Sequence, residues 1–188
     1  MTPKAERKFY LREYMAISRA ISTYEDINLL LQHLVEGVCR TFKIKACSIL
    51  LYDDNEKELF RISSCGLSDE YISKGSIHMY EGFDAFQKGE SIFYVSHTEN
   101  ASLQYADEAI KEGIVSMLSM PIKSGNAVIG ILKCYHSEQI LMHEDDLESI
   151  KSLLMQVGMA IKSNGMKNFI DNLKAAVDNL PFYISEGC

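Results

Sequence analysis

The chain has 188 residues, of which 47% are hydrophobic and 24% charged, a balance typical of one globular domain with flanking elements. Its formal net charge is −7 and its lysines and arginines form no cluster. This argues against a nucleic-acid-binding surface, which concentrates positive charge. No segment has the apolar character of a signal peptide or membrane span, so we expect a cytoplasmic protein without membrane insertion.

Five cysteines are present: Cys39, Cys47, Cys65, Cys134 and Cys188. Their odd number and the absence of a CxxC pair favour reduced thiols over a disulfide framework. Because Cys39 falls on the apolar face of a predicted helix and Cys47 in a predicted strand, we expect both thiols to be buried, and a redox role is the less favoured alternative.

Two helices are predicted near the N-terminus. The first covers residues 9–22 and has a narrow stripe formed by Leu11, Met15, Ser18 and Ile21. Ser22 and Glu25 then have the spacing of a capping box. The second helix has apolar residues at regular helical spacing, namely Ile27, Leu30, Leu31, Leu34, Val35, Val38, Cys39 and Phe42. His33 lies off this stripe and is expected to be solvated.

The middle of the chain alternates between strands and short helices. Residues 45–53 form a near-continuous apolar run that predicts a strand covered on both faces, followed by a turn and a second strand at 59–65. Gly66 permits a sharp turn, and Ser68 is placed to cap a short helix. Further on, the pattern predicts a short helix at 83–88, a strand at 91–95, a loop at 97–102 and a helix at 103–112.

A second hairpin is predicted between residues 114 and 135, where two β-branched runs flank a polar break at 124–126. We place it in the middle of an antiparallel sheet, with Pro121 late in its strand or where no partner accepts a hydrogen bond. A long helix follows from residue 143, and Asn164-Gly165 is a candidate interruption. Beyond it, a further apolar stripe consists of Met166, Phe169, Ile170, Leu173, Val177 and Leu180.

A family resemblance is carried by two stretches of this hairpin, Gly113-Ile114-x-Ser116-x-Leu118-x-x-Pro121-Ile122 and Val128-Ile129-Gly130-Ile131-Leu132. They resemble the C-terminal half of a GAF domain, a small-molecule sensor module of bacterial signalling proteins that is related in shape to PAS domains. The resemblance covers roughly residues 25–162 and includes the opening helix, the Ala46-x-Ser48-Ile49 strand and the Gly66-Leu67-Ser68 turn.

This resemblance implies an α+β fold with a central antiparallel sheet of about six strands. Long terminal helices would cover one face, and short helices and a pocket would lie on the other. We accordingly divide the chain into an N-terminal helix (1–24), a GAF domain (25–163) and a C-terminal helix or linker (164–188). Residues 175–182 resemble the segment that precedes a PAS domain. Such a segment is expected if this chain is one part of a longer sensor protein.

The resemblance also implies a set of pocket residues. Cyclic-nucleotide-binding GAF domains line their pocket from the first two strands, the mid-chain helix and the central hairpin. The matching positions here are Ser48, Leu50, Ile62, Ser64, Asp107, Ile110, Ile114, Ser116, Lys133 and Tyr135. Strand alternation places Leu50 and Ile62 on the same faces as Ser48 and Ser64. The set combines apolar side chains with polar groups, as small-molecule pockets do.

Several departures from the sequence signatures of other GAF domains restrict the class of ligand. The Asn-Lys, Phe and Asp-Glu signature of cyclic-nucleotide binders is replaced by His136-Ser137, Met142 and Asp145-Asp146, which disfavours cyclic nucleotides. In the loop before Leu103, Ser96 and Asn100-Ala101 stand where many bacterial members have acids, which weakens a metal or strong cation site. No Cys-His pair of the bilin-attaching kind occurs. Cys134 and His136 share a strand face, but no second pair completes a tetrahedral metal site. The sequence therefore identifies no cofactor and no metal.

No GxSxG, phosphate-loop or HExxH motif is present, which favours a non-catalytic protein. Together with the family resemblance, this favours a sensor of a small anionic or polar molecule. Lys133 either extends to water or meets an anion, and Asp107 is either solvated or pairs with Lys133. Surplus apolar stripes at 11–21 and 166–180 predict a homodimer that relays the signal. The alternatives are a dimerisation module with a vestigial pocket and a thiol-dependent reductase of free methionine sulfoxide using Cys65 and Cys134.

Overall fold

The computed structural model of the chain describes residues 7–24, 26–78, 88, 90–95, 104–139 and 142–178. In this part of the chain a six-stranded antiparallel sheet has the order β3-β2-β1-β6-β5-β4. Its strands are β1 (Ala46–Asp53), β2 (Glu58–Cys65), β3 (Ile77–His78), β4 (Ile92–Val95), β5 (Ser116–Ser124) and β6 (Ala127–His136). The predicted hairpin of β5 and β6 therefore lies inside the sheet, as expected. The helix predicted at 83–88 and the loop at 97–102 fall almost wholly outside the described residues.

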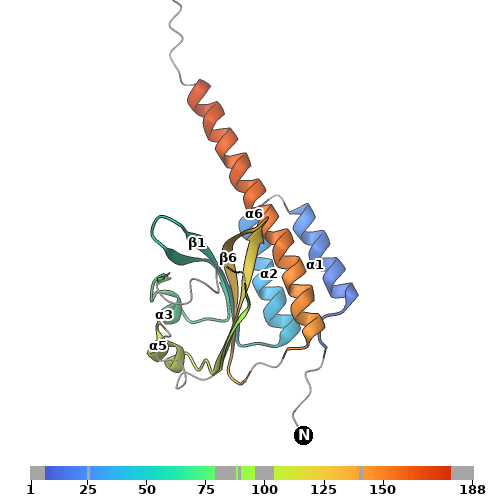
Figure 1. Cartoon of the computed structure of the whole chain (residues 1–188), viewed down its shortest axis with the longest axis vertical. Helices are drawn as coiled ribbons and strands as arrows, with labels where there is room; N and C mark the ends of the chain where they lie inside the picture. Colours follow the sequence, from blue (N-terminus) through green and yellow to red (C-terminus); the bar gives the residue numbers. More distant parts are fainter. Residues whose placement is uncertain are drawn as a thin grey trace, which may run out of the picture.

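The helices divide between the two sides of the sheet (Figure 1). Helices α2 (Ile27–Phe42) and α6 (Glu144–Asp178) pack against one side, and α1 (Leu11–Thr23) packs on both of them. The short helices α3 (Asp69–Ile72) and α5 (Ala106–Lys111) lie on the other side. We call these sides the helix face and the pocket face. This arrangement confirms the predicted α+β architecture. No helix in the described ranges is long and apolar enough to cross a membrane.

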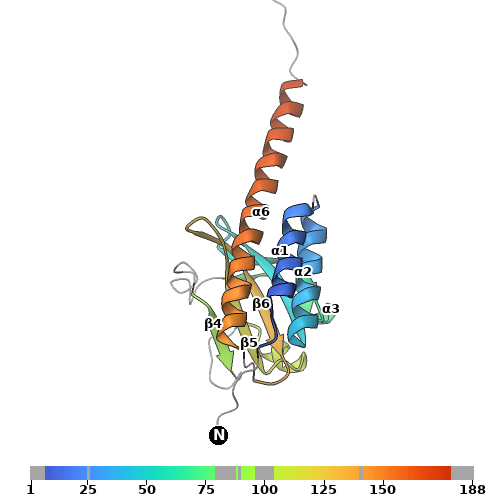
Figure 2. The same ribbon diagram turned by 90° about the vertical axis from the view of Figure 1, so that its right-hand side faces the viewer.

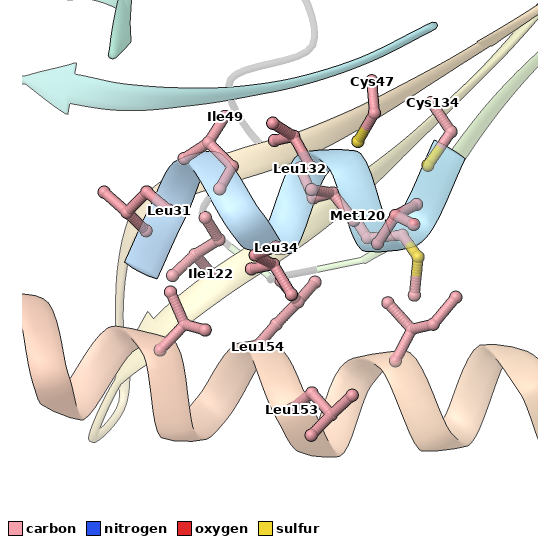
Figure 3. Packing of buried hydrophobic residues seen from close by; sticks show 14 of the residues in the cluster. Leu31, Leu34, Cys47, Ile49, Met120, Ile122, Leu132, Cys134, Leu153 and Leu154 are labelled. Carbon is pink, nitrogen blue, oxygen red and sulfur yellow. The ribbon is translucent and has the colours of Figure 1, made fainter. Parts of the chain in front are cut away.

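The main hydrophobic core fills the space between the sheet and the helices on the helix face (Figure 3). Alternate residues of β5 and β6 point into it, among them Met120, Ile122 and Leu132, which are fully buried. They meet the predicted stripes of α2 and α6, represented by Leu34 and Leu154. Burying such a side chain stabilises a fold by roughly 1.5–3 kcal/mol, so this layer dominates the stability of the domain.

A buried carboxylate attaches the N-terminal segment to this layer. Asp146, in the first turn of α6, is 1% exposed and accepts hydrogen bonds from the backbone N–H groups of Lys8 at 2.8 Å and Phe9 at 2.9 Å. Phe9 is itself buried, and its ring packs against Phe42 at the end of α2 with 5.8 Å between centroids. The segment before α1 is thereby fixed to both α2 and α6.

Two predictions about the first helices had different outcomes. Helix α1 packs through Ile17 and Ile21, while Leu11 and Met15 are 72% and 48% exposed, so part of the surplus apolar stripe expected at 11–21 is uncovered in the monomer. The capping box is not formed, because Ser22 lies in the last turn of α1, where its hydroxyl donates to the carbonyl of Arg19. Asp26 caps α2 instead, since its carboxylate accepts a hydrogen bond from the backbone N–H of Asn28 at 2.8 Å.

Helix α6 is unbroken through the Asn164-Gly165 step and extends well beyond the rest of the domain (Figure 2). One interior glycine costs a helix only about 1 kcal/mol relative to alanine, which helix formers on either side offset. The boundary that we drew between residues 163 and 164 thus falls inside one helix. Gly158 is needed for another reason: a Cβ there would lie 1.9 Å from the carbonyl oxygen of Lys123 in β5.

Candidate ligand-binding site

A β-bulge in β2 decides which side chains reach the pocket face. Ser48 of β1 lies opposite Ser64 of β2, but the register then shifts, and Leu50 lies opposite Arg61. Ile62 is the extra residue, and it packs against the helix-face core. Arg61 therefore takes the pocket position predicted for Ile62. Simple alternation missed the change because a bulge inserts one residue without an obvious sequence signal.

The predicted hydroxyl of β5 is also replaced by a neighbour. Lys133 of β6 lies opposite Ser119, whereas Ser116 lies opposite His136. Because side chains alternate between the faces, Ser119 rather than Ser116 shares the pocket face with Lys133. The Ser116 hydroxyl donates to the carbonyl of Glu138 at 2.5 Å. The buried Ser119 hydroxyl finds no hydrogen-bond partner within the described ranges.

The helix α5 contributes less to the site than predicted. Asp107 is exposed and Ile110 is 57% exposed, since Ala109 provides the buried side of this helix. In the described part of the chain, no ion pair joins Asp107 to Lys133. The apolar residues Leu50 and Ile114 are both buried, in separate small clusters. Asp107 is thus a solvated residue, the simpler of the two roles considered.

The centre of the pocket face is a buried pair of hydroxyls. The Tyr135 hydroxyl lies 3.0 Å from that of Ser48, and both side chains are fully buried. The ring of Tyr71, presented by α3, meets that of Tyr135 edge to face with 5.8 Å between centroids. Burial raises the pKa of Tyr135, while the Ser48 hydroxyl and the Arg61 guanidinium partly offset this. Tyr135 therefore remains a neutral hydrogen-bonding group at physiological pH.

Three cationic side chains gather around these tyrosines, and we call them the cation cluster: Arg61 of β2, Lys74 after α3, and Lys133 of β6. The ammonium nitrogen of Lys74 lies 3.1 Å from the centroid of the Tyr71 ring, and the guanidinium carbon of Arg61 lies 6.0 Å from it. Both contacts have cation–π geometry. Lys133 is only 8% exposed.

The electrostatics of the cation cluster disfavour its fully charged form. Burial, followed by the charge of Arg61, lowers the pKa of Lys133 to about 8. Burial and the charges of Lys133 and Arg61 lower the pKa of Lys74 to about 7, although Glu108 and Glu112 oppose this. No carboxylate within the described ranges forms a salt bridge with any of the three cations.

Unused hydrogen-bond donors accompany these charges. One guanidinium nitrogen of Arg61 donates to the carbonyl of Ile72 at 3.1 Å, but its buried Nε has no partner in the described part of the chain. The same holds for the Ser119 hydroxyl. Buried donors without partners are costly, and donors beside cations suit an anionic acceptor. The arrangement can thus hold a carboxylate or a phosphate.

Arg61 and Ser64 are reached from a groove of about 450 Å³ along β2, beyond the point where β3 pairs with it. Its remaining lining residues are Gln32, Phe60, Ile62, Ser63, Ile72, Gly75 and Ser76. Tyr71 also lines a second hollow of about 260 Å³, together with Ser68, Glu70, Glu108, Lys111 and Glu112. Glu108 and Glu112 are near enough to Lys74 to oppose the lowering of its pKa.

Sequence reasoning brought together Ser48, Lys133 and Tyr135 but missed Arg61, Lys74 and Ser119. An arginine between Phe60 and Ile62 in an apolar strand was a usable signal, because charged residues rarely lie in strands covered on both faces. Lys74 lies in a loop and carried no such signal. Among the described residues, no group of three or more histidine, cysteine or acidic side chains is arranged to hold a metal ion.

The chain belongs to the GAF domain family, whose profile matches residues 25–162. GAF domains are small-molecule-sensing modules, and solved structures with the same fold span a range of functions. The GAF domain of a phosphoenolpyruvate-protein phosphotransferase from Coxiella burnetii is 19% identical, with a TM-score of 0.74 over 84% of this chain and 95% of that one.

Two other solved structures carry ligands. The phycoerythrobilin-bound GAF domain of a cyanobacterial phytochrome is 13% identical, with a TM-score of 0.68 over 85% of this chain and 100% of that one. Free methionine-R-sulfoxide reductase from Neisseria meningitidis, solved with its substrate, is also 13% identical, with a TM-score of 0.68 over 87% of this chain and 98% of that one. At these identities the likeness establishes the fold alone. No curated protein sequence matches the chain.

Proposed function

We propose that this protein is a non-catalytic sensory GAF module that binds a small organic anion at the cation cluster. The observation that carries this proposal is the convergence of three cations on the pocket face without a carboxylate partner in the described part of the chain. Clustered positive charges repel one another and lower one another's pKa values. A bound anion offsets this repulsion. The family relationship supports a sensory role, because GAF domains sense small molecules.

Each of the three cations would contribute differently to binding the anion. The planar fork of Arg61 suits a carboxylate or phosphate group, while the ammonium groups of Lys74 and Lys133 act as point charges. The hydroxyls of Ser119 and Tyr135 would supply neutral contacts. Because these groups lie in a buried, partly apolar setting, each charge-assisted hydrogen bond is stronger there than at an exposed surface.

A thermal-shift screen of carboxylated and phosphorylated metabolites tests the proposal. We expect an acidic ligand to raise the melting temperature of the wild type and to lose most of this effect in Lys133→Met and Arg61→Met. Lys123→Met is the matched control, because Lys123 is a half-buried lysine of the same sheet outside the cluster. Equal stabilisation of wild type and both cluster variants would remove the cluster from ligand binding.

The terminal helices of a homodimer would carry the signal, as a shift in population between two helix arrangements. Met155, Met159, Met166 and Ile170 of α6 are between 48% and 59% exposed. At 100° per residue they occupy a strip about 60° wide. A continuous exposed apolar strip on a helix that leaves the domain is the kind of surface that a second copy covers.

Sedimentation equilibrium tests the dimer. We expect wild type to dimerise at tens of micromolar, a rough range for a modest interface, and Met166→Lys or deletion of residues 166–188 to give monomer. Asn168→Lys is the control, because Asn168 is exposed on the opposite side of α6. A monomeric wild type would refute the relay through a dimer and leave the ligand site to be judged separately.

Two other functions remain as alternatives. If no ligand stabilises the wild type while the dimer forms, a dimerisation module with a vestigial pocket is the better description. The reductase hypothesis relied on Cys65 and Cys134, but both side chains join the helix-face core, on the opposite side of the sheet from the cation cluster. Thiol-dependent turnover of free methionine sulfoxide would establish that activity.

A further inference from the structure

Four cysteines that are far apart in the sequence come together on the helix face, and we call them the thiol cluster: Cys39, Cys47, Cys65 and Cys134. Cys47 of β1 lies directly opposite Cys65 of β2 on one side and Cys134 of β6 on the other. Figure 3 shows the side chains of Cys47 and Cys134 pointing the same way, toward α2. From α2, the sulfur of Cys39 reaches to 3.8 Å from the carbonyl oxygen of Cys65.

The thiols lie close enough to affect one another's acidity. The pKa of Cys39 responds to Cys47 and Cys65, and the pKa of Cys47 responds to Cys39 and Cys134. All four are free thiols in the structure. Sequence reasoning expected buried, reduced cysteines, but the pairing register that brings them together was not visible in their spacing.

The thiols of the cluster differ in solvent exposure and in pKa. Cys47 and Cys134 are buried, while Cys39 and Cys65 are partly exposed. Hydrogen bonding from Cys47 lowers the pKa of Cys39, and that from Cys65 adds to this, against the effects of burial and of Glu36. Burial raises the pKa values of Cys47 and Cys65. Since the thiolate is the reactive form, Cys39 is the thiol of the cluster best suited to attack an oxidant from solvent.

We propose that the thiol cluster is an oxidation site, at which a peroxide converts Cys39 into a disulfide with Cys47 or Cys65. This proposal does not depend on the anion site, which lies on the opposite face of the sheet. Because Cys39 belongs to α2 and its two neighbours to β1 and β2, the disulfide covalently joins α2 to the sheet.

The chemistry balances with peroxide as the oxidant. The thiolate of Cys39 attacks one oxygen of the peroxide, the O–O bond breaks, and Cys39 sulfenic acid forms while the other oxygen leaves as hydroxide, or as alkoxide from an organic peroxide. The thiol of Cys47 or Cys65 then attacks the sulfenic sulfur, the S–O bond breaks and water leaves with the thiol proton. Both sulfurs are oxidised and the peroxide is reduced.

The test uses the full chain with Cys188→Ser, which removes a thiol outside the described residues. The protein is treated with equimolar hydrogen peroxide and quenched. Free thiols are then blocked, and the peptides are mapped before and after reduction. We expect a disulfide-linked pair that contains Cys39 and either Cys47 or Cys65, and recovery of both thiols with dithiothreitol.

Two variants extend this result. Cys39→Ser should abolish the disulfide, and Cys134→Ser should retain it, because Cys134 lies opposite Cys47 in the sheet and is not one of the proposed partners of Cys39. Thermal melts will check that both variants are folded. The peptide map of the Cys188→Ser protein tests the proposal independently of them, because that protein keeps all four cysteines of the cluster. If peroxide leaves Cys39 as a thiol or as an unlinked higher oxide, or joins it only between chains, the proposed site does not exist.

Discussion

Replacing Lys133 with methionine is expected to make the ligand-free protein more stable. Burial and the charge of Arg61 lower the pKa of Lys133 from the ordinary 10.5 to about 8. One pKa unit corresponds to 1.36 kcal/mol, so keeping this ammonium charged in the folded state costs about 3 kcal/mol at pH 7. Methionine has a similar length and no charge, and it removes this cost while filling the same space.

The assay is urea denaturation of wild type and Lys133→Met at pH 7, without ligand. We expect the free energy of unfolding to rise by up to about 3 kcal/mol, since relaxation around the charge reduces the full value. Lys123→Met, with a half-buried side chain in the same sheet, should stay within about 0.5 kcal/mol of wild type. The same Lys133 variant should lose affinity for acidic ligands, which combines a gain in stability with a loss of function.

The pH dependence has a definite sign. Between pH 8 and 10.5 the unfolded chain keeps the Lys133 proton while the folded chain has lost it, so wild-type stability rises with pH in this window. Tyr71 and Tyr135 have raised pKa values and act in the opposite direction above pH 10. The measurement is therefore the difference in free energy of unfolding between wild type and Lys133→Met from pH 7 to 9.5. This difference should shrink as pH rises. A variant that is less stable than wild type at pH 7 would refute this account.

Three further predictions follow from the contacts. Calorimetric titration with an acidic ligand found in the screen should give weaker binding at pH 9 than at pH 6.5, because the two lysines of the cluster lose their protons near pH 7 and 8 while the guanidinium stays charged; equal affinities would contradict a role for the lysines. Gly158→Ala should destabilise the fold by about 1–3 kcal/mol because its Cβ would meet the β5 backbone, whereas Gly165→Ala has free space and should gain about 0.5–1 kcal/mol in urea melts. Asp146→Asn should lose about 1–3 kcal/mol of unfolding free energy, because a charged acceptor of two backbone N–H groups becomes a neutral amide; an unchanged midpoint would show that the N-terminal segment adds little.

The helix-face half of the fold was predictable because it depends on periodicity. The stripe of α2 and the alternating strands β5 and β6 each bury one continuous set of apolar residues, and such sets are visible in the sequence. The break expected at Asn164-Gly165 was wrong because local propensity is weak compared with a long run of compatible residues. Phe9 and Ile21 determine how α1 meets the core, and Leu11 and Met15 of the predicted surplus stripe are exposed.

The site was less predictable because it depends on register. Ser48, Lys133 and Tyr135 were found because β1 and β6 pair without irregularity over the length that contains them. Ile62 was wrong because one bulged residue reversed the faces beyond it and brought Arg61 to the pocket instead. No period in a single sequence reports which strand residue is bulged, or that a loop lysine will lie over an aromatic ring.

The same register places the two proposed sites next to each other through the sheet. The pair of Ser48 and Lys133 faces the pocket, and the adjacent pair of Cys47 and Cys134 faces the helices, on the same two strands. A ligand that changes the spacing of β1 and β6 at the first pair therefore acts one residue away from the thiols packed under α2. Because α2 and α6 pack on this part of the sheet, we expect a displacement at this point to reach both helices. Coupling of about 1–3 kcal/mol between two such sites is enough for a switch, and it would act equally in both directions.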